Sequence, residues 1–242
     1  MADAVVIIPT YNEIENIERL VRNIYALQRD FHVLVVDDGS PDGTAGKVRE
    51  LQKVYDKKLF LIERSGKQGL GTAYIAGFKW SLDRSYEFIF EMDADFSHNP
   101  NDLMRLYNAC AKDGYDLSIG SRYVTGVNVV NWPMGRVLLS WCASRYVKFI
   151  TGMPIHDTTA GFICYRREVL ESIDLNKIKF VGYAFQIEMK YKAYLKNFKI
   201  KEVPVVFTDR TKGESKMSTG IISEAVFGVI KMRLTQLFKK TK

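Results

Sequence analysis

Two carboxylates, one residue apart, follow an apolar segment near the middle of the chain. The apolar segment covers residues 86–92 and leads directly into Asp93, Ala94 and Asp95. Side chains alternate along an extended chain, so the two carboxylates are expected to point the same way. Together their oxygens suit one hard divalent cation, which in turn could hold a diphosphate. Considered alone, the pair is more typical of a solvated acidic loop. Its assignment as a metal site therefore depends on the surrounding sequence.

Two more polar loops follow segments that we expect to be buried strands. Residues 9–13 (PTYNE) follow a strand at 4–9, and Asp37 and Asp38 follow a strand at 33–36. Open α/β sheets bind their ligands outside the carboxyl ends of parallel strands. Three polar loops at one edge of the sheet therefore predict a binding cleft. Because this cleft is acidic, an anion bound there would need a metal bridge.

The elements that must position these loops alternate between strand and helix. Residues 86–92 are bulky and apolar without polar alternation, which is typical of a strand in the middle of a parallel sheet. Helical apolar spacing follows each strand, and Asn12 is expected to cap the first helix. This alternation predicts an α/β fold with a doubly wound, mostly parallel sheet flanked by helices. The strands expected in the first half cover residues 4–9, 33–36, 59–62 and 86–92.

The second half of the chain contains two long helical patterns. Residues 134–151 predict a helix that is stopped by Gly152 and Pro154. Residues 219–238 predict an amphipathic helix that ends in lysines, and this helix is either an interfacial membrane anchor or a cover for the core. The other expected elements are strands at 117–120, within 157–165 and, at the sheet edge because of Pro204, at 201–207, and a helix at 185–195.

Length, composition and charge favour one globular domain with an anionic partner. The chain has 242 residues, of which 47% are hydrophobic and 26% are charged. Its net charge of +7 suits a nucleic acid, an acidic lipid or a phosphorylated substrate. A nucleic acid is disfavoured, because basic runs with interleaved aromatic residues are missing from the sequence and the predicted cleft is acidic.

The cysteines and the hydropathy pattern are typical of an intracellular protein. Cys110, Cys142 and Cys164 are widely spaced in apolar surroundings and are expected to be reduced core thiols. We expect no signal peptide, because a strand begins at Ala4. No run reaches the ~18 apolar residues that a membrane span requires.

Two common nucleotide-binding motifs do not fit the sequence. A dinucleotide fingerprint needs G-x-G-x-x-G after the first strand, where this chain has PTYN, and residues 66–72 do not supply a phosphate loop. A base and ribose held by Tyr11, Glu13 and the loop of Asp37 and Asp38, with a diphosphate on a metal, suit a nucleotide sugar instead.

Six motifs occur in an order that resembles a known enzyme family. They are PTYNE (9–13), VVDDGSPDGT (35–44), GLGTAYIAGF (69–78), MDADFSH (92–98), GSRYV (120–124) and DRTKGESKM (209–217). They resemble the inverting family 2 glycosyltransferases of the GT-A fold and, within them, the polyprenol-phosphate (dolichol-phosphate) mannosyltransferases. The match covers nearly the whole chain, and the last two motifs are the most specific. The Q-x-x-R-W signature of processive polysaccharide synthases is absent from the sequence, which favours a single sugar transfer.

The resemblance implies a donor site in the first half of the chain. Asp93 and Asp95 would hold Mg²⁺ or Mn²⁺, with Ala94 also contacting the donor, and Ser97 stands where some relatives have Gln. The domain would divide into a nucleotide-sugar-binding half (1–120), an acceptor-binding half (121–218) and a C-terminal amphipathic helix (219–242). The residues that would line the nucleotide pocket are Pro9, Tyr11, Glu13, Asp38, Asp42, Lys67 and Gly69.

The resemblance also implies an acceptor site. Lys216 would lie in a loop that closes over donor and acceptor. Arg136, Ser140 and Ser144 are spaced by four residues and predict a polar stripe on an apolar helix, although Ser144 alone suits a solvated helix face. Residues 157–161 suit turn chemistry better than a role in the acceptor site. The residues that would hold the acceptor phosphate are Arg122, Arg136, Ser140 and Arg210, and arginine suits this role because its guanidinium binds phosphate in a bidentate manner.

The activity that the resemblance implies is metal-dependent, inverting transfer of mannose from GDP-mannose to a polyprenyl (dolichyl-type) monophosphate. A UDP-glucose-dependent polyprenyl-phosphate glucosyltransferase is the nearest alternative, and a non-catalytic subunit of a membrane glycosylation complex is an alternative of another class. The implied partners are a membrane surface and a small membrane-protein subunit. The expected location is peripheral, on the cytoplasmic face of a membrane.

Overall fold

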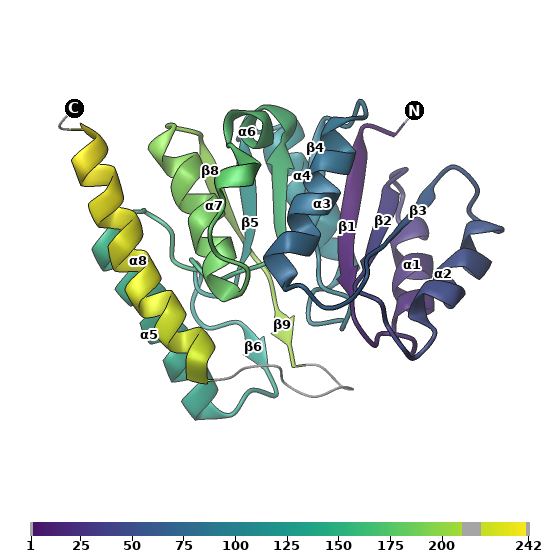
Figure 1. Cartoon of the computed structure of the whole chain (residues 1–242), viewed down its shortest axis with the longest axis horizontal. Helices are drawn as coiled ribbons and strands as arrows, with labels where there is room; N and C mark the ends of the chain where they lie inside the picture. Colours follow the sequence, from purple (N-terminus) through teal and green to yellow (C-terminus); the bar gives the residue numbers. More distant parts are fainter. Residues whose placement is uncertain (1, 210–218, 241–242) are drawn as a thin grey trace.

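A seven-stranded sheet forms the centre of the molecule (Figure 1). The computed structural model describes residues 2–209 and 219–240. The strand order is β3-β2-β1-β4-β7-β5-β8, and every neighbouring pair is parallel except the two that involve β7. The mostly parallel sheet is confirmed, and the reversed β7 is a departure that strand periodicity does not reveal. The strands are β1 (Ala4–Thr10), β2 (His32–Asp37), β3 (Leu59–Glu63), β4 (Phe88–Glu91), β5 (Leu117–Ser121), β7 (Ile163–Arg166) and β8 (Ile200–Pro204).

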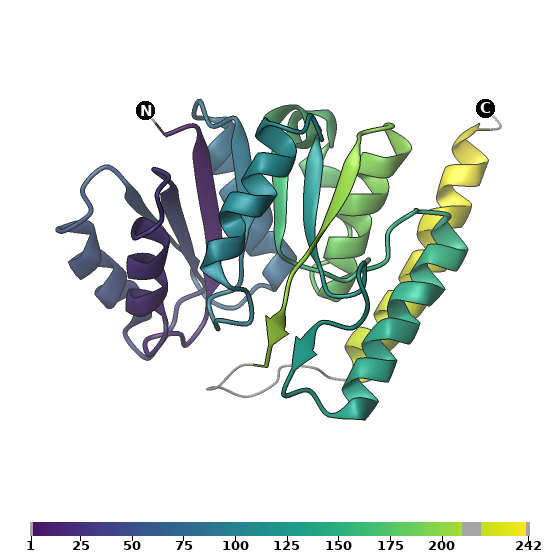
Figure 2. The same cartoon turned by 180° about the vertical axis from the view of Figure 1, so that it is seen from behind.

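Helices cover both faces of this sheet (Figures 1 and 2). A second, two-stranded sheet pairs β6 (Val129–Val130) with β9 (Phe207–Thr208). The short 3₁₀ helices are η1 (Pro100–Asp102) and η2 (Leu175–Lys177). The α-helices are α1 (Ile17–Tyr25), α2 (Thr44–Gln52), α3 (Leu70–Leu82), α4 (Leu103–Ala111), α5 (Met134–Thr151), α6 (Arg167–Ser172), α7 (Tyr183–Leu195) and α8 (Thr219–Lys240).

Alternate residues of β1 pack into two different cores. Val5 and Ile7 belong to a cluster with side chains of α3, α6 and α7, whereas Val6 and Ile8 belong to a cluster with α1, α2 and α4. All four residues of β4 are buried as well. Burial on both faces explains why these strands are continuous apolar runs rather than alternating ones.

The loops after β1 and β2 are tied to each other at the carboxyl edge of the sheet. The Asp38 N–H donates to the Thr10 carbonyl at 3.0 Å, and Asp42 accepts the Ile14 N–H at 3.0 Å. Because β4 lies next to β1 in the sheet, the loop after β4 ends at the same edge. The three polar loops therefore meet, as the sequence predicted.

The predicted helix cap at Asn12 is wrong. Helix α1 begins at Ile17, and Asn16 holds the N-cap position. Asn12 has a φ of 60°, and its N–H donates to the Ser40 hydroxyl at 3.0 Å. Asparagine tolerates this left-handed conformation, so the same residue type that favours caps serves here in a turn that joins two loops.

Helix α3 lies unusually close to its neighbours because of its glycines. A Cβ on Gly77 would lie 2.6 Å from the Ile7 side chain, and a Cβ on Gly71 would lie 2.7 Å from the ring of Phe185. The motif GLGTAYIAGF therefore positions α3 against β1 and α7.

We expect Gly77→Ala to lower the free energy of unfolding by about 1–3 kcal/mol, because the new methyl group overpacks the contact with Ile7. Gly46 of α2 is the matched control, since a Cβ there would meet no atom within 4 Å. Gly46→Ala should raise stability by up to about 1 kcal/mol through helix propensity. Urea unfolding of both variants measures the difference, and equal shifts would contradict the packing argument.

Helices α5 and α8 lie side by side at one edge of the molecule (Figures 1 and 2). The Tyr146 hydroxyl of α5 donates to the Val226 carbonyl of α8 at 2.9 Å, and Val229 is buried. In α8, packing on the core is thus combined with an exposed apolar side. None of the helices over residues 2–209 and 219–240 is long and apolar enough to cross a membrane. The exposed large apolar side chains of the two helices are Met134, Leu138, Leu139, Trp141, Phe149, Val226, Phe227, Ile230 and Leu234.

Two of the three cysteines lie in the core. Cys110 and Cys164 are buried, as expected, but Cys142 is exposed, so its prediction as a core thiol is wrong. The reason is that Cys142 lies on the part of α5 that borders an open cavity, so solvent reaches its thiol.

Candidate active site

A cavity of about 380 Å³ lies at the carboxyl ends of β4 and β5. Part of its wall is polar and part is apolar. The polar and glycine wall residues include Asp93, Asp95, Ser97, His98, Gly120, Arg122, Arg136, Ser140, Thr159, Gly161 and Gln186. The apolar and aromatic wall residues include Trp132, Leu139, Ala143, Tyr146, Val147, Val205, Phe207 and Val226.

Both carboxylates of the central motif line this cavity, as the sequence predicted. The Tyr74 hydroxyl donates to Oδ1 of Asp93 at 3.3 Å, and the Ser97 N–H donates to Oδ1 of Asp95 at 3.0 Å. Phe96 has a φ of 61°, which marks the tight turn that directly follows Asp95. The turn holds two negatively charged groups on one wall of the cavity.

His98 holds the backbone of this turn. Its Nδ1 accepts the Asp93 N–H at 3.2 Å, and its ring stacks on Phe162 with the ring centres 4.8 Å apart. A ring whose Nδ1 accepts a hydrogen bond carries its proton on Nε2. Burial lowers the pKa of His98 to about 4, so the ring stays neutral. The sequence analysis missed this role because the three histidines are scattered along the chain.

The neutral state of His98 predicts acid-sensitive stability. Because the unfolded chain binds a proton at His98 below pH 6.5 and the folded chain does so only near pH 4, stability falls as the pH drops through this window. The loss from this group is about 2 kcal/mol between pH 7.5 and pH 5. His98→Asn keeps an acceptor near the position of Nδ1 without titrating, so its urea-unfolding stability should decline less over this range. Parallel pH profiles of the two proteins would contradict the assignment.

The predicted nucleotide residues gather in the loops after β1, β2 and β3, outside the cavity wall. The Lys67 ammonium lies 5.2 Å from the centre of the Tyr11 ring. Asp38 forms an ion pair with Arg64 at 3.1 Å, and burial raises the pKa of this carboxyl despite its partner. An aromatic face, a cation and a buried carboxylate are thus close together at the carboxyl edge.

Other predicted nucleotide residues have contacts that shape the fold. Asp42 accepts the Thr44 hydroxyl at 2.6 Å, and Glu13 accepts the side-chain amide of Asn16 at 2.9 Å. Pro9 is a residue of β1 in register with Val36. Gly69 precedes α3 with a φ of 99°, where a Cβ would lie 3.1 Å from Val181. Their contact with a nucleotide stays a prediction.

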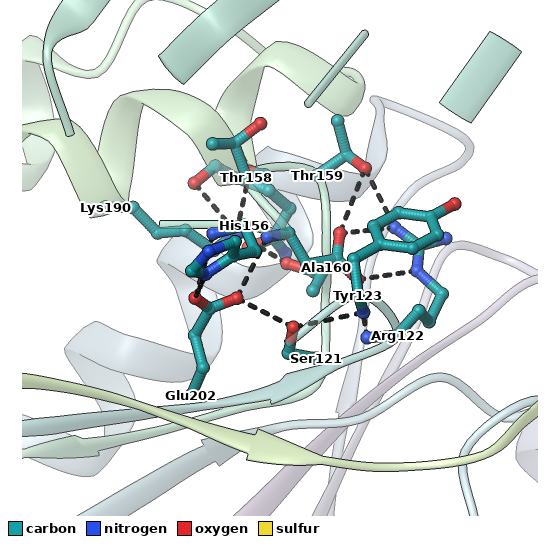
Figure 3. A network of polar contacts seen from close by, with 11 residues as sticks. Ser121, Arg122, Tyr123, His156, Thr158, Thr159, Ala160, Lys190 and Glu202 are labelled. Carbon is teal, nitrogen blue, oxygen red and sulfur yellow. Dashed lines mark hydrogen bonds and ion pairs between the residues drawn. The ribbon is translucent and has the colours of Figure 1, made fainter. Parts of the chain in front are cut away.

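Arg122 is held in a buried ion pair (Figure 3). Its Nε donates to Oδ2 of Asp157 at 2.7 Å, its Nη2 donates to Oδ1 at 2.6 Å, and Nη2 also donates to Thr159 Oγ1 at 2.8 Å. Burial opposes the charge on Asp157, but the guanidinium of Arg122 holds the pKa of that carboxyl below its usual value. The turn predicted within residues 157–161 is present at Thr158 and Thr159, and the same segment also fixes the arginine.

Two charged residues fix the segment that carries Asp157 (Figure 3). Oε1 of Glu202, on β8, accepts the Asp157 N–H at 2.9 Å, and its Oε2 accepts the His156 N–H at 2.8 Å. The fully buried ammonium of Lys190, on α7, donates to the Ala160 carbonyl at 2.6 Å, and burial lowers the pKa of this lysine to about 8. The orientation of Arg122 thus depends on residues from β8 and α7.

Arg136 lies at the start of α5 and lines the same cavity as the acidic turn. It donates to Asp209 at 2.8 Å, and its guanidinium lies 4.0 Å from the centre of the Trp132 ring. Ser140 lines the cavity one turn later. Ser144 is buried, so a solvated helix face is the wrong interpretation there. Arg210 and Lys216 lie outside the described residues.

Three residues at the cavity were missed by sequence reasoning. Trp132 and Gln186 line the wall, and Glu91 lies directly behind it as a buried residue of β4. Trp132 had no distinctive signal in the sequence. A glutamate inside an apolar strand was a usable signal, because a buried charge needs a partner.

The residues of the acidic turn fit a divalent metal. Asp93 and Asp95 supply hard oxygen donors on one wall, and the buried hydroxyl of Ser97 has no hydrogen-bond partner among the described residues. No group of three or more His, Cys, Asp and Glu residues suited to a metal occurs in the described part of the chain. A cation held here would therefore complete its coordination with substrate oxygens or water, as Mg²⁺ commonly does.

Residues 5–174 match the family model described as "Glycosyl transferase family 2". The chain belongs to glycosyl transferase family 2. Its family relatives include the polyprenol monophosphomannose synthase of Mycolicibacterium smegmatis, which is 50% identical over 93% of this chain and 84% of that protein. The undecaprenyl-phosphate mannosyltransferase of Micrococcus luteus is 45% identical over 94% of this chain and 93% of that protein.

Solved structures place this glycosyltransferase in the GT-A fold. A mannosyltransferase from Pyrobaculum calidifontis, solved with GDP-Man and Mn²⁺, has a TM-score of 0.61 at 21% identity, covering 88% of this chain and 58% of that one. Glucosyl-3-phosphoglycerate synthase from Mycobacterium tuberculosis was solved with Mn²⁺, UDP and glucosyl-3-phosphoglycerate. It has a TM-score of 0.69 at 18% identity, covering 96% of this chain and 80% of that one. The predicted family and fold are both confirmed.

Proposed function

We propose that this glycosyltransferase transfers mannose from GDP-mannose to a polyprenyl monophosphate and inverts the anomeric configuration. The single observation that carries the proposal is the lining of the cavity, in which Asp93 and Asp95 from the turn after β4 occur together with Arg136 and apolar residues of α5. Such a cavity suits a metal-held diphosphate next to an anionic lipid headgroup. The two close relatives, named for polyprenol and undecaprenyl phosphate, support this acceptor class.

Asp93 and Asp95 would hold the Mg²⁺ or Mn²⁺ ion, as predicted. When bound, the ion neutralises charge on the diphosphate leaving group. The carboxylates themselves have a second effect, since their negative charges would repel the diphosphate unless a cation is bound between them and the diphosphate. An apo enzyme should consequently bind GDP-mannose weakly.

The phosphate of the acceptor would lie against Arg136 and Trp132. The Arg136 Nε and the Trp132 Nε1 are buried donors that have no hydrogen-bond partner among the residues described. Both groups can only donate, which suits the oxygens of a phosphate. Arg122, fixed by Asp157, lines the same cavity and would set the position of the headgroup.

The chemistry requires little from the protein beyond positioning and charge. A polyprenyl phosphate has a second pKa of about 6, so at neutral pH it is largely a dianion and attacks without a general base. The arginines would hold its oxygen in line with the anomeric carbon while the leaving diphosphate stays on the opposite wall. Direct displacement of this kind converts an α-linked donor into a β-linked mannosyl phosphate.

The test is sugar transfer to a short polyprenyl phosphate with Mn²⁺, comparing GDP-mannose with UDP-glucose under identical conditions. We expect transfer from GDP-mannose alone. Transfer from UDP-glucose alone would keep the fold and the chemistry but replace the donor. A chain that transfers neither sugar would favour the non-catalytic alternative, which the assembled acidic and basic cavity walls oppose.

The apolar sides of α5 and α8 would bind the membrane surface that contains the acceptor. Phe149 and Phe227 are 85% and 72% exposed, and Leu139 and Val226 connect the two helices to the cavity wall. Exposed apolar area of this kind is typical of an interfacial surface. A position on the cytoplasmic face and a small membrane-protein subunit stay predictions.

We expect the double variant Phe149→Asp and Phe227→Asp to lose at least about tenfold in affinity for liposomes containing anionic lipid, because two exposed aromatic side chains that would insert into the membrane are replaced by negative charges. Val54 is the matched control: it is 65% exposed but lies just after α2, in the donor half. Co-sedimentation should show that Val54→Asp binds like wild type. Equal loss in both proteins would contradict a specific membrane surface.

A further inference from the structure

Gln186 presents a buried side-chain oxygen to the cavity. This residue of α7 is 2% exposed and lines the cavity wall. Its Nε2 donates to Oε2 of Glu91, whereas its Oε1 has no hydrogen-bond partner among the described residues. A buried acceptor left without a donor costs free energy, so this arrangement needs a reason.

Glu91 determines which end of the Gln186 amide faces the cavity. Glu91 is fully buried at the end of β4, and its other oxygen accepts the Tyr165 hydroxyl at 2.9 Å. Each carboxylate oxygen of Glu91 thus accepts one hydrogen bond, one from the Tyr165 hydroxyl and one from the amide nitrogen of Gln186. Because the amide nitrogen is the donor in this contact, the amide oxygen is the end of the side chain that is left for the cavity.

The chemical groups of the proposed substrates indicate what this oxygen would bind. The phosphate groups of donor and acceptor carry acceptor oxygens, and the polyprenyl chain has no polar group, so neither supplies a donor to Gln186. The transferred sugar supplies hydroxyl donors.

We propose that Oε1 of Gln186, oriented by Glu91, accepts a hydrogen bond from a hydroxyl group of the transferred sugar and contributes to sugar specificity. The inference rests on the proposed function for the presence of a hexosyl donor in this cavity, and it does not require that the hexose be mannose. Gln186 would act as a binding residue, and Glu91 would act as the residue that positions it.

The test compares wild type with Gln186→Met, which has a similar size but no amide. Both are assayed with the intact donor and with monodeoxy donors that each lack one sugar hydroxyl. We expect one deoxy donor to lower kcat/KM by about 10- to 100-fold in wild type but by less than about threefold in the variant. The variant should also lose about 10- to 100-fold with the intact donor and bind free GDP as wild type does. Equal losses with every deoxy donor in both proteins would overturn the proposal.

Two further variants separate this role from a structural one. Thr158→Val is the control, because the Thr158 hydroxyl is also buried without a described partner but does not line the cavity, and its deoxy-donor profile should match wild type. Glu91→Gln keeps the shape of the buried residue but replaces one of its two acceptor oxygens with an NH₂ group, which cannot accept a hydrogen bond from the amide of Gln186. It should weaken the same deoxy-donor discrimination, and retention of full discrimination would overturn the role of Glu91.

A failure of the Gln186 proposal can be distinguished from a failure of the proposed function. If wild type transfers glucose from UDP-glucose and not mannose from GDP-mannose, the proposed donor is wrong, and the same set of assays with deoxyglucose donors still tests Gln186. A Gln186→Met protein that fails to fold is recognised by its urea unfolding. In that case Glu91→Gln with the deoxy donors decides the question.

Discussion

Asp95→Ala is expected to lower sugar transfer by at least about 10³-fold, which corresponds to about 4 kcal/mol of lost transition-state stabilisation. The reason is that the turn after β4 offers two carboxylates to a metal, and one is too few to hold a divalent cation beside a diphosphate. The measurement is initial-rate transfer from GDP-mannose over a Mn²⁺ titration. Asp95→Asn should lose nearly as much, since it keeps the shape but not the charge.

Asp113→Ala is the matched control for this experiment. Asp113 is an exposed aspartate just after α4, far along the chain from the acidic turn. Its variant should show the wild-type rate and the wild-type Mn²⁺ dependence. Near-native transfer by Asp95→Ala in a metal-dependent assay would overturn the metal assignment.

Arg122→Met is expected to lower the free energy of unfolding by about 3–5 kcal/mol and also to abolish most transfer. The stability loss arises because Asp157 is completely buried and would keep an uncompensated charge. The transfer loss arises because Arg122 also lines the cavity where the acceptor phosphate would lie. Urea unfolding and initial rates measure the two effects separately.

The double variant Arg122→Met and Asp157→Asn distinguishes the two roles of the arginine. Removing both charges together should restore much of the lost stability, because the buried carboxylate is gone. Transfer should stay low, because the methionine at position 122 cannot replace a guanidinium at the phosphate. If the double variant regains both stability and transfer, Arg122 serves only the fold and its assignment to the acceptor is wrong.

Local sequence patterns predicted most of the secondary structure. The helix over Met134–Thr151 was predicted with the observed boundaries, since Gly152 adopts the left-handed conformation that ends it. The apolar runs of β1, β2 and β4 were also clear, because strands buried on both faces lack polar alternation. The reversed β7 was not predictable in this way, because strand direction depends on the path of the connecting chain.

Chemistry that depends on adjacent residues was likewise readable from the chain. Asp93 and Asp95 were recognised by their spacing after a strand, and the resemblance to the family pointed to Arg136, whose helical spacing to Ser140 supported it. Asn12 shows the limit of such reasoning, since the same side chain favours a helix cap and a left-handed turn, and the choice depended on a bond to Ser40 from another loop.

The sequence by itself determined the family, the buried strands of the parallel part of the sheet and the acidic turn, because these follow from short-range patterns of residue type. Only the tertiary structure decided which side chains are paired and which face the cavity. The Arg122–Asp157 pair joins residues 35 positions apart, and the contact between Gln186 and Glu91 spans 95 positions. Such partners are set by the packing of β5, β4 and α7 around one cavity, and no local spacing along the chain encodes them.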